Sequence, residues 1–311
     1  MRILITGVTG FVGRHLAAHA LSEGAEVYGL ARSRSPVVPG VRMLFGDLLR
    51  PVSVRAAVLK AKPARIFHLA GIAWLPLCEE QLKKTFATNV EGTRHVLEAA
   101  LSLGTRPKVL VSGSAEEYGR SSKRRKLREN SPMHPEIVYS RSKMLQELLG
   151  FYYFSQRRLP VVRARAFNHI GPGQSERYSA SGFAKQAAAI ALGRQEPEIR
   201  VGNLKAVRDY TDVRDVVRAY WLLLEKGKPG EAYNVASGKG RRVEEILRFY
   251  LDNASVTIKA TVDPTRLRRP DLPYFIGDAS KLRRATGWKP RIGFERTLSD
   301  IFEDWKEKLG N

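Results

Sequence analysis

Two side chains that can move a proton together, Tyr139 and Lys143, stand four residues apart. On a helix, this spacing places both on one face. A tyrosine with an ordinary pKa of ~10 is a poor acid or base at neutral pH, but a lysine charge within a few ångströms favours the phenolate and lowers that pKa. The pair therefore predicts a general acid or base, although the same spacing also occurs in helices where the tyrosine is half-buried and the lysine is solvated.

A glycine-rich turn near the N-terminus gives that pair a context. The apolar opening segment predicts a strand, and Gly7, Gly10 and Gly13 follow it at once, leading into a helical pattern. Gly7 permits the tight turn, Gly10 lets the backbone approach a pyrophosphate, and Gly13 allows close helix packing. The spacing is GxxGxxG, and it predicts a dinucleotide site to which Phe11 and Val12 also belong.

The composition describes a globular protein of more than one unit. The chain has 311 residues, 43% of them hydrophobic, with a mean hydropathy of -0.29. No apolar run approaches the ~18 residues of a membrane span, and no signal peptide precedes the first strand segment, so we expect a cytoplasmic protein. The single Cys78 excludes an internal disulfide, and the six scattered His show no metal-ligand spacing, so no metal is expected.

A strong positive charge is the unusual feature of the composition. The chain carries 53 Lys and Arg against 31 Asp and Glu, a formal charge of +22 with a pI of about 10.3, which favours anionic partners. Nucleic acid is one candidate, but no nucleic-acid motif is present, and the densest basic cluster, 123–126 with Arg128, is interpreted as a solvated loop. Nucleotide diphosphates and NADP would benefit from the same field.

Strand and helix patterns alternate through the first two thirds of the chain. Alternation of this kind predicts an α/β fold with a doubly wound parallel (Rossmann) sheet, accompanied by a smaller C-terminal α/β substrate domain. The expected strands lie at 2–6, 26–30, 65–70 and 108–112, with a further apolar segment at 41–45. Ligands of such sheets bind beyond the carboxyl ends of the strands, so the residues after each strand are functional candidates.

The residues after the second strand bear on the choice of cofactor. Arg32 and Arg34 stand where NAD-binding proteins usually carry an acidic residue for the ribose 2′-hydroxyl. A guanidinium suits a 2′-phosphate in charge and geometry, so NADP(H) is favoured, with NAD(H) as the alternative. The alternative is that both arginines are exposed loop residues that bind no ligand.

Two further strand ends supply cofactor candidates. Asp47 and Leu48 follow an apolar segment, and Asp47 could contact the adenine or merely cap the next helix. Leu69, Ala70 and Gly71 end the next strand, where small residues would let the cofactor backbone pass.

Several motifs spread over nearly the whole chain belong together: the glycine turn, 68–70, 88–93, 112–119, and 129–130 leading to the tyrosine and lysine pair. Together they resemble the extended short-chain dehydrogenase/reductases that act on nucleotide sugars. By this resemblance Ser114 would hydrogen-bond the substrate oxygen at C4, Tyr139 would exchange its proton, and Lys143 would hold the nicotinamide ribose and lower the tyrosine pKa. Asn89 would be a structural or water-relay residue, with a helix N-cap as the equal alternative.

Three later segments, 165–174, 201–215 and 277–281, look like the GDP-mannose branch of that family. By the family pattern Asn168 would position the sugar or the diphosphate. Arg208 and Arg268 would grip the two phosphates, which agrees with the bidentate pairing of arginine and phosphate oxygens. Arg269 competes with Arg268 for this role.

The resemblance also implies an organisation. It implies an NADP-binding Rossmann domain at 1–165, to which later segments return, a mainly nucleotide-sugar substrate-binding domain at 166–311, and a homodimer through a four-helix bundle. One departure is the apolar segment 72–78, where a polar substrate loop is expected. In it, Trp74 could stack on a sugar face or belong to the core.

The activity that the resemblance implies is a reduction. NADPH would deliver hydride to C4 of a GDP-linked 4-keto-6-deoxymannose while Tyr139 protonates the alkoxide. A 4,6-dehydratase of GDP-mannose is the chief rival, because Glu116 stands where that enzyme has a carboxylate acting at C5 and C6. A sugar 4-epimerase is a third alternative. A non-enzymatic NADP-binding regulator of a polyanion is the fourth, and the combination of Ser114, Tyr139 and Lys143 speaks against it.

Overall fold

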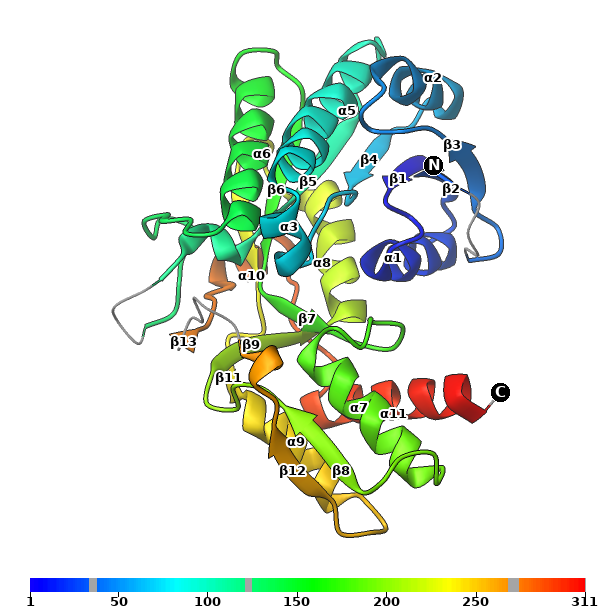
Figure 1. Cartoon of the computed structure of the whole chain (residues 1–311). Helices are drawn as coiled ribbons and strands as arrows, with labels where there is room; N and C mark the ends of the chain where they lie inside the picture. Colours follow the sequence, from blue (N-terminus) through cyan, green and yellow to red (C-terminus); the bar gives the residue numbers. More distant parts are fainter. Residues whose placement is uncertain (34–37, 121–124, 268–273, 311) are drawn as a thin grey trace.

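The computed structural model describes residues 1–33, 38–120, 125–267 and 274–310 (Figure 1). Its larger lobe is built on a seven-stranded sheet with the order β10-β6-β5-β4-β1-β2-β3, in which every neighbouring pair is parallel. The strands are β1 (Arg2–Thr6), β2 (Glu26–Ala31), β3 (Arg42–Phe45), β4 (Arg65–His68), β5 (Lys108–Ser114), β6 (Val161–Ala166) and β10 (Ala232–Val235). The expected doubly wound parallel sheet is confirmed, and the expected strand positions agree within a few residues.

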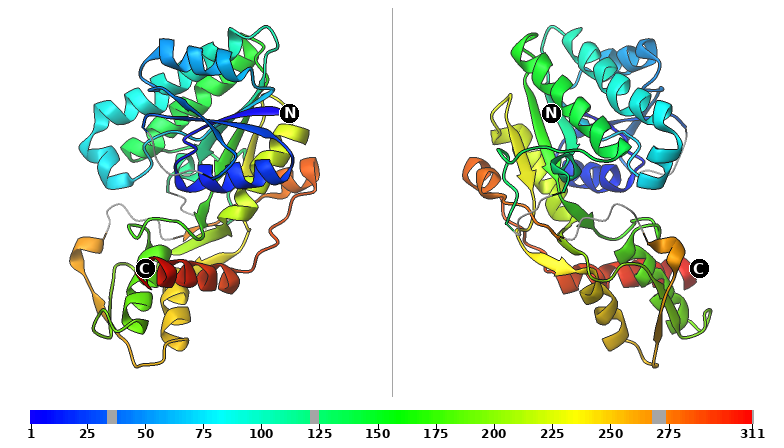
Figure 2. Two further views of the ribbon diagram at one scale, coloured as in Figure 1. Left: turned by 90° about the vertical axis from the view of Figure 1, so that its right-hand side faces the viewer. Right: turned by 60° about the vertical axis from the view of Figure 1, so that its left-hand side comes forward.

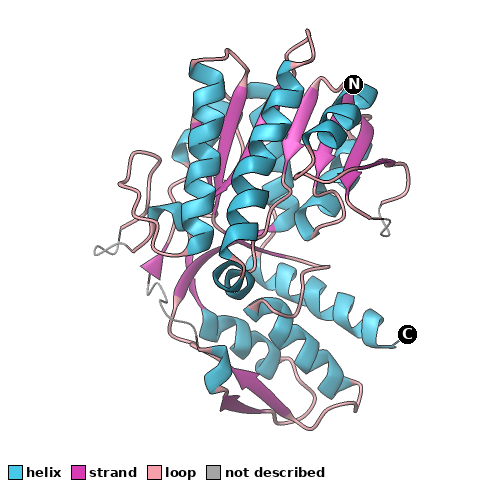
Figure 3. Cartoon of the chain, turned by 45° about the horizontal axis from the view of Figure 1, so that its top comes forward, coloured by secondary structure: helices cyan, strands magenta, loops and turns pink. Residues whose placement is uncertain are grey.

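Helices cover both faces of this sheet, as Figure 3 shows. The long ones are α1 (Phe11–Ser22), α2 (Pro51–Ala61), α5 (Gly92–Leu101), α6 (Val138–Ser155) and α8 (Val213–Lys226). The short ones are α3 (Leu75–Glu80), α4 (Leu82–Phe86), the π-helix η1 (Ala87–Glu91), the 3₁₀ helix η2 (Ala115–Tyr118) and α10 (Ser280–Thr286). Helices α1 and α8 pack together on one face, and α2, α5 and α6 pack on the other.

Alternation of side chains along the central strands produces these two layers. In β1, Ile3 and Ile5 belong to the core cluster under α1 and α8, whereas Leu4 belongs to the cluster under α2, α5 and α6. Successive side chains of a strand point to opposite faces, and a strand covered on both faces must be apolar on both. This explains why the opening strand segment is apolar throughout.

The smaller lobe has its own core and lies beside the carboxyl ends of the large sheet (Figure 2). It contains two small sheets, in which β9 pairs with β7, β11 and β13, and β8 pairs with β12. The strands are β7 (Asn168–Ile170), β8 (Glu198–Val201), β9 (Val207–Asp212), β11 (Gly240–Arg242), β12 (Lys259–Val262) and β13 (Tyr274–Phe275). The helices are α7 (Ser179–Ala191), α9 (Val243–Asp252), η3 (Pro264–Arg266) and α11 (Phe294–Gly310).

The chain crosses between the lobes more than once. It leaves the large sheet after β6, builds β7, α7, β8 and β9, and then returns through α8 and β10, which is hydrogen-bonded to β6. No helix within the described residues is long and apolar enough to cross a membrane.

Candidate active site

The site begins with a serine and a tyrosine brought together from two elements. Ser114 is the last residue of β5, and Tyr139 lies in the first turn of α6, with the serine side chain near enough to influence the pKa of the phenol. The serine is buried, with 7% of its surface exposed, and its Oγ also accepts the backbone N–H of Glu116 at 3.2 Å. A hydroxyl and a phenol are thus joined at the carboxyl edge of the sheet, where ligands of such folds bind.

Lys143 follows Tyr139 by one helical turn and is itself buried, with 7% exposed. Its Nζ donates to Gln146 Oε1 at 2.5 Å, and burial lowers the pKa of Lys143 to about 8. The pKa of Tyr139 is raised, because burial outweighs the lowering effect of the nearby Ser114 side chain. The expectation that the lysine charge would depress the tyrosine pKa therefore does not hold for the chain alone, since desolvation is the larger effect.

The glycine turn has the shape that a pyrophosphate needs. Gly7 adopts a φ of +73°, and a Cβ atom on it would lie 2.9 Å from the backbone of Ala70. A Cβ on Gly13 would lie 2.1 Å from the carbonyl oxygen of Gly7, so only glycine allows this approach of helix and turn. Gly10 precedes α1 and has no side chain to cap the N–H groups of its first turn, to which Phe11 and Val12 belong. The cradle therefore fits a dinucleotide phosphate group.

The loop after β4 forms the neighbouring wall of this cradle. Ala70 donates its N–H to Thr6 Oγ1 at 3.2 Å, which ties the loop to the end of β1. Leu69 and Ala70 are half-buried, and a Cβ on Gly71 would lie 2.8 Å from Asn89 Oδ1. The small residues predicted to let a cofactor pass are thus packed directly against the glycine turn.

Asn89 holds this loop through its side chain. Its Oδ1 accepts the N–H of Ile72 at 2.8 Å, and its Nδ2 donates to the oxygen of Ile72 at 3.0 Å and to Ser142 Oγ at 2.9 Å. The residue lies inside the π-helix η1 and is fully buried. The N-cap interpretation is wrong, because the helical backbone continues on both sides of Asn89.

The residues predicted to contact the adenosine end lie at the ends of β2 and β3. Arg32 is exposed directly after β2, and Arg34 lies outside the described residues. Asp47 Oδ1 accepts the N–H of Leu49 at 2.9 Å, which closes a turn before α2, whose N-cap residue is Arg50. Leu48 is buried, and its carbonyl oxygen is 2.6 Å from His95 Nδ1.

The predicted substrate residues are connected to Ser114 by strand register. Ser114 pairs with Ala166 on β6, and two residues later Asn168 begins β7 opposite Tyr210 on β9. Arg208 precedes Tyr210 by two residues on the same strand, and its Nη1 donates to the carbonyl oxygen of Val207 at 3.0 Å. These side chains are partly exposed, as is Glu116, while Arg268 and Arg269 lie outside the described residues.

Tyr178 lies near Tyr139 and was not anticipated from the sequence, whereas Glu116, which also lies near it, was. After burial, both residues contribute to the raised pKa of Tyr139. Next to Tyr178, the guanidinium of Arg177 lies over the ring of half-buried Trp74, 4.5 Å from its centre. Trp74 is only half-buried and a cation of the smaller lobe lies over its ring, so the core interpretation is wrong, whereas stacking on a sugar stays a prediction. No sequence signal indicates this contact, which joins residues more than a hundred positions apart.

A buried charged cluster behind Ser114 was also missed. Glu117, Glu147 and Arg165 have 0%, 1% and 4% of their surfaces exposed. A signal existed for the first of them, because Ser114 and Glu117 have the S-x-x-E spacing of a capping box, and the structure contains that box. The other two carry no local signal, since glutamate and arginine on a helix and a strand normally face solvent.

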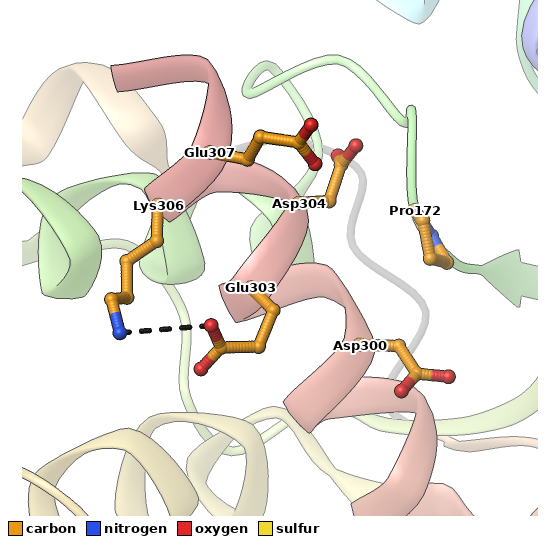
Figure 4. Close-up of a pocket in the computed structure, with 6 residues that line it drawn as sticks. All are labelled: Pro172, Asp300, Glu303, Asp304, Lys306 and Glu307. Atoms are coloured by element: carbon orange, nitrogen blue, oxygen red, sulfur yellow. Dashed lines mark ion pairs between the residues drawn. The ribbon is translucent and has the colours of Figure 1, made fainter. Parts of the chain in front are cut away.

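A hollow on the outer side of α11 is not part of this site. Figure 4 shows its lining residues, Pro172 together with Asp300, Glu303, Asp304, Lys306 and Glu307, and the ion pair in which Lys306 Nζ lies 3.6 Å from Glu303 Oε2. None of the residues discussed above lines it. Its carboxylates would repel a diphosphate.

A glycine turn on a parallel sheet, with serine, tyrosine and lysine at the carboxyl edge, defines the class of NAD(P)-dependent short-chain dehydrogenase/reductases. Residues 4–301 match the family model described as GDP-mannose 4,6 dehydratase, and the chain belongs to this family.

Two relatives of the chain carry the names of different activities. The chain is 32% identical to GDP-6-deoxy-D-mannose reductase of Pseudomonas aeruginosa over 99% of its own length and 98% of the relative. It is 28% identical to GDP-mannose 4,6 dehydratase 2 of Arabidopsis thaliana over 97% of its length and 86% of that protein. Reductases and dehydratases are therefore both among its relatives.

A solved structure agrees with the fold. The RMD protein of Pseudomonas aeruginosa, solved in complex with NADPH, superimposes with a TM-score of 0.89 at 31% identity, covering 99% of this chain and 100% of that one. The expectation of an extended short-chain dehydrogenase/reductase fold, with its smaller C-terminal lobe, is confirmed.

Proposed function

We propose that this protein reduces the C4 keto group of GDP-4-keto-6-deoxy-D-mannose with NADPH to give GDP-6-deoxy-D-mannose (GDP-D-rhamnose). The observation that carries the proposal is the proximity of Ser114 and Tyr139 at the carboxyl edge of the sheet, with Lys143 one turn further along the helix. Reduction of a ketone needs a proton donor at the developing alkoxide and a second donor to stabilise it. Tyr139 and Ser114 can supply these two donors.

Each catalytic side chain has a separate task. Tyr139, whose raised pKa keeps it protonated, donates its proton to the C4 oxygen. Ser114 donates a hydrogen bond to the same oxygen and fixes the ketone. Lys143, with a pKa of about 8, is mostly charged at neutral pH, so it can hold the nicotinamide ribose and favour the phenolate after proton transfer.

The cofactor residues follow from the glycine cradle. We assign the pyrophosphate to Gly7, Gly10, Phe11, Val12 and Gly13. NADPH, when bound, supplies the hydride. The other contacts of the cofactor are assigned to the remaining strand ends, namely Arg32 for the 2′-phosphate, Asp47 and Leu48 for the adenine, and Leu69, Ala70 and Gly71 along the cofactor backbone.

We assign the GDP-sugar to residues of the smaller lobe. Asn168 and Arg208 reach the site through the register that connects β5, β6, β7 and β9, and they are assigned to the sugar or diphosphate. Arg268 is assigned to the second phosphate. We accordingly treat 1–165, with the segments that return to it, as the NADP domain and 166–311 as mainly the substrate domain.

The dehydratase alternative rests on Glu116, which lies near Tyr139 and is partly exposed. A dehydratase needs a carboxylate at this place to remove the C5 proton. The reductase is favoured by the 32% identity over 98% of the reductase's length, against 28% over 86% of the dehydratase. Reduction at C4 requires no base at C5.

The stoichiometry of cofactor oxidation distinguishes the reductase from the dehydratase. Freshly made GDP-4-keto-6-deoxymannose and NADPH should give one oxidised cofactor per product, measured by absorbance with identification of the sugar nucleotide. A Glu116→Gln variant should keep a substantial fraction of this rate. Formation of a 4-keto sugar from GDP-mannose alone, abolished by Glu116→Gln, would replace the reductase with the dehydratase.

We further propose a homodimer through α6. Four large apolar side chains of this helix are 39% to 49% exposed, at spacings of three and four residues that place them on one face: Leu145, Leu148, Phe151 and Tyr152. Sedimentation of the wild type and of Leu148→Glu tests it, because a charge on this face should give a monomer.

A further inference from the structure

Two carboxyl groups lie in contact behind the catalytic serine. Glu117 comes from η2 and Glu147 from α6, one turn after Lys143, and both are buried. They pack against Gly113, where a Cβ would lie 2.7 Å from Glu117 Oε1 and 3.2 Å from Glu147 Oε2. The space that a side chain at 113 would occupy is thus filled by the carboxyl pair.

The arginines around the pair donate hydrogen bonds to only one of the two groups. Arg165 donates to Glu147 through Nε at 2.8 Å and through Nη2 at 2.5 Å, and Arg163 Nη1 donates to the same carboxylate at 3.1 Å. Glu117 lies 4.0 Å from Arg165 Nε at the nearest. Buried Lys143 is near enough for its charge to interact with Glu117, but its Nζ donates its hydrogen bond to Gln146. A second ionised carboxylate here would therefore be buried without a hydrogen-bonded cation of its own, which is costly.

The hydrogen bonds of Glu117 leave one oxygen for a proton. Its Oε1 accepts the backbone N–H of Ser114 at 2.6 Å, whereas its Oε2 is buried without a hydrogen-bond donor among the described residues. Burial and the neighbouring Glu147 raise the pKa of Glu117 well above its usual value, while Arg165 lowers that of Glu147. A proton on Glu117 Oε2 can be donated to Glu147, which satisfies the orphaned atom.

We propose that Glu117 is a positioning residue that acts as a neutral carboxylic acid: it shares its proton with the Glu147 carboxylate and holds the backbone of Ser114 for reduction of the substrate. The role rests on the proposed function. An ionised Glu117, hydrogen-bonded to the amide of Ser114, would oppose the negative charge that develops on the C4 oxygen beside the Ser114 hydroxyl. The neutral acid keeps the serine in place without that repulsion.

Two substitutions distinguish a neutral acid from an ionised one. Glu117→Gln keeps an acceptor for the Ser114 N–H and places an N–H donor toward Glu147, so turnover should stay within about threefold of the wild type. Glu117→Leu removes both bonds, so kcat per NADPH-binding site should fall about tenfold or more, with the dissociation constant of NADPH little changed. A merely structural role would lower the folded fraction and leave turnover per binding site unchanged.

Infrared spectroscopy can detect the proton on the Glu117 carboxyl group without any substrate. Carboxyl groups labelled with ¹³C in glutamate should show the C=O band of a protonated acid at neutral pH, and this band should vanish in Glu117→Gln. Glu116→Gln is the matched control, since it removes the adjacent, partly exposed carboxyl and should leave the band in place.

The outcomes separate this proposal from the proposed function. If the wild type fails to reduce the 4-keto sugar, the function is wrong, but the band still shows whether Glu117 holds a proton. Absence of the band, its persistence in Glu117→Gln, or a glutamine variant as impaired as the leucine variant would overturn the neutral acid. Wild-type turnover per NADPH-binding site in Glu117→Leu would also overturn the proposal of a neutral acid. Should Glu117→Leu not fold, the band and the glutamine variant decide alone.

Discussion

The carboxyl edge of the sheet has two ends, the glycine turn and the surroundings of Ser114, and different features set their geometry. Around the glycine turn, the geometry is set by backbone and by missing side chains, because a Cβ on Gly13 would meet the Gly7 carbonyl oxygen at 2.1 Å. Around Ser114, it is set by buried polar side chains, with Glu117, Glu147 and Arg165 packed into one hydrogen-bonded cluster. In the proposed function, the first end binds a phosphate through N–H groups and shape. The second end transfers protons, which needs ionisable groups whose surroundings control their charge.

The difference predicts different failures. A substitution at the glycine end should act on cofactor binding and leave the chemistry of bound molecules intact. A substitution at the serine end should act on turnover and leave binding intact. The following variants test this contrast.

The largest effect is expected from Tyr139→Phe. The change removes one proton donor and leaves the ring, so kcat should fall by ~10²-fold or more while NADPH affinity stays nearly constant. Single-turnover reduction measures the rate, and a separate titration with NADPH measures the affinity. Retention of more than about a tenth of the rate would remove the tyrosine from its assigned role.

Gly13→Ala should have the opposite effect: weaker NADPH binding, with the chemistry of bound molecules intact. The methyl group would lie 2.1 Å from the Gly7 carbonyl oxygen and 2.7 Å from Val8 Cα, both backbone atoms that cannot turn aside. Overpacking of this kind costs ~1–3 kcal/mol, and NADPH affinity should fall about tenfold or more because the turn must shift. Calorimetric titration measures it, and Gly104→Ala, where nothing lies within 4 Å, is the control. Unchanged affinity in Gly13→Ala would mean that the turn is not the phosphate site.

Arg32→Glu should change the preference between cofactors more than it changes activity. It exchanges a favourable contact with the 2′-phosphate for a repulsive one, so NADPH should bind more weakly, by roughly tenfold or more, and NADH should gain relative to it. Dissociation constants for both cofactors measure the effect. Equal weakening of the two would show that Arg32 has a structural task.

The smallest effect concerns the pH dependence of stability at Lys143. The folded pKa of about 8 lies below the ordinary 10.5, so between these values the unfolded chain binds more protons than the folded one. The contribution of this side chain to the free energy of unfolding should therefore rise across that window and be constant below it. Denaturant unfolding of the wild type and of Lys143→Met from pH 7 upward should show the wild type gaining relative to the variant. A constant or shrinking difference would contradict the buried, charged lysine.

The position of the chemistry along the chain was accessible from the sequence. The strand after Met1, the glycine spacing and the Tyr139 to Lys143 interval are local patterns, and local patterns fix turns and helix faces. The alternation of strand and helix patterns also predicted the parallel sheet, because consecutive parallel strands are joined by crossover helices. From that sheet, the location of Ser114 at its carboxyl edge followed.

Only the tertiary structure decided the state of the side chains there. The burial of Lys143, the contact of Arg177 with the Trp74 ring, and the meeting of Glu117 and Glu147 behind Ser114 all depend on packing between segments distant in sequence. The direction of the Tyr139 pKa shift was predicted wrongly for the same reason, since burial is set by everything that packs around a group. Spacing in the sequence determines which residues can meet, while the packed interior determines which of them carry charge.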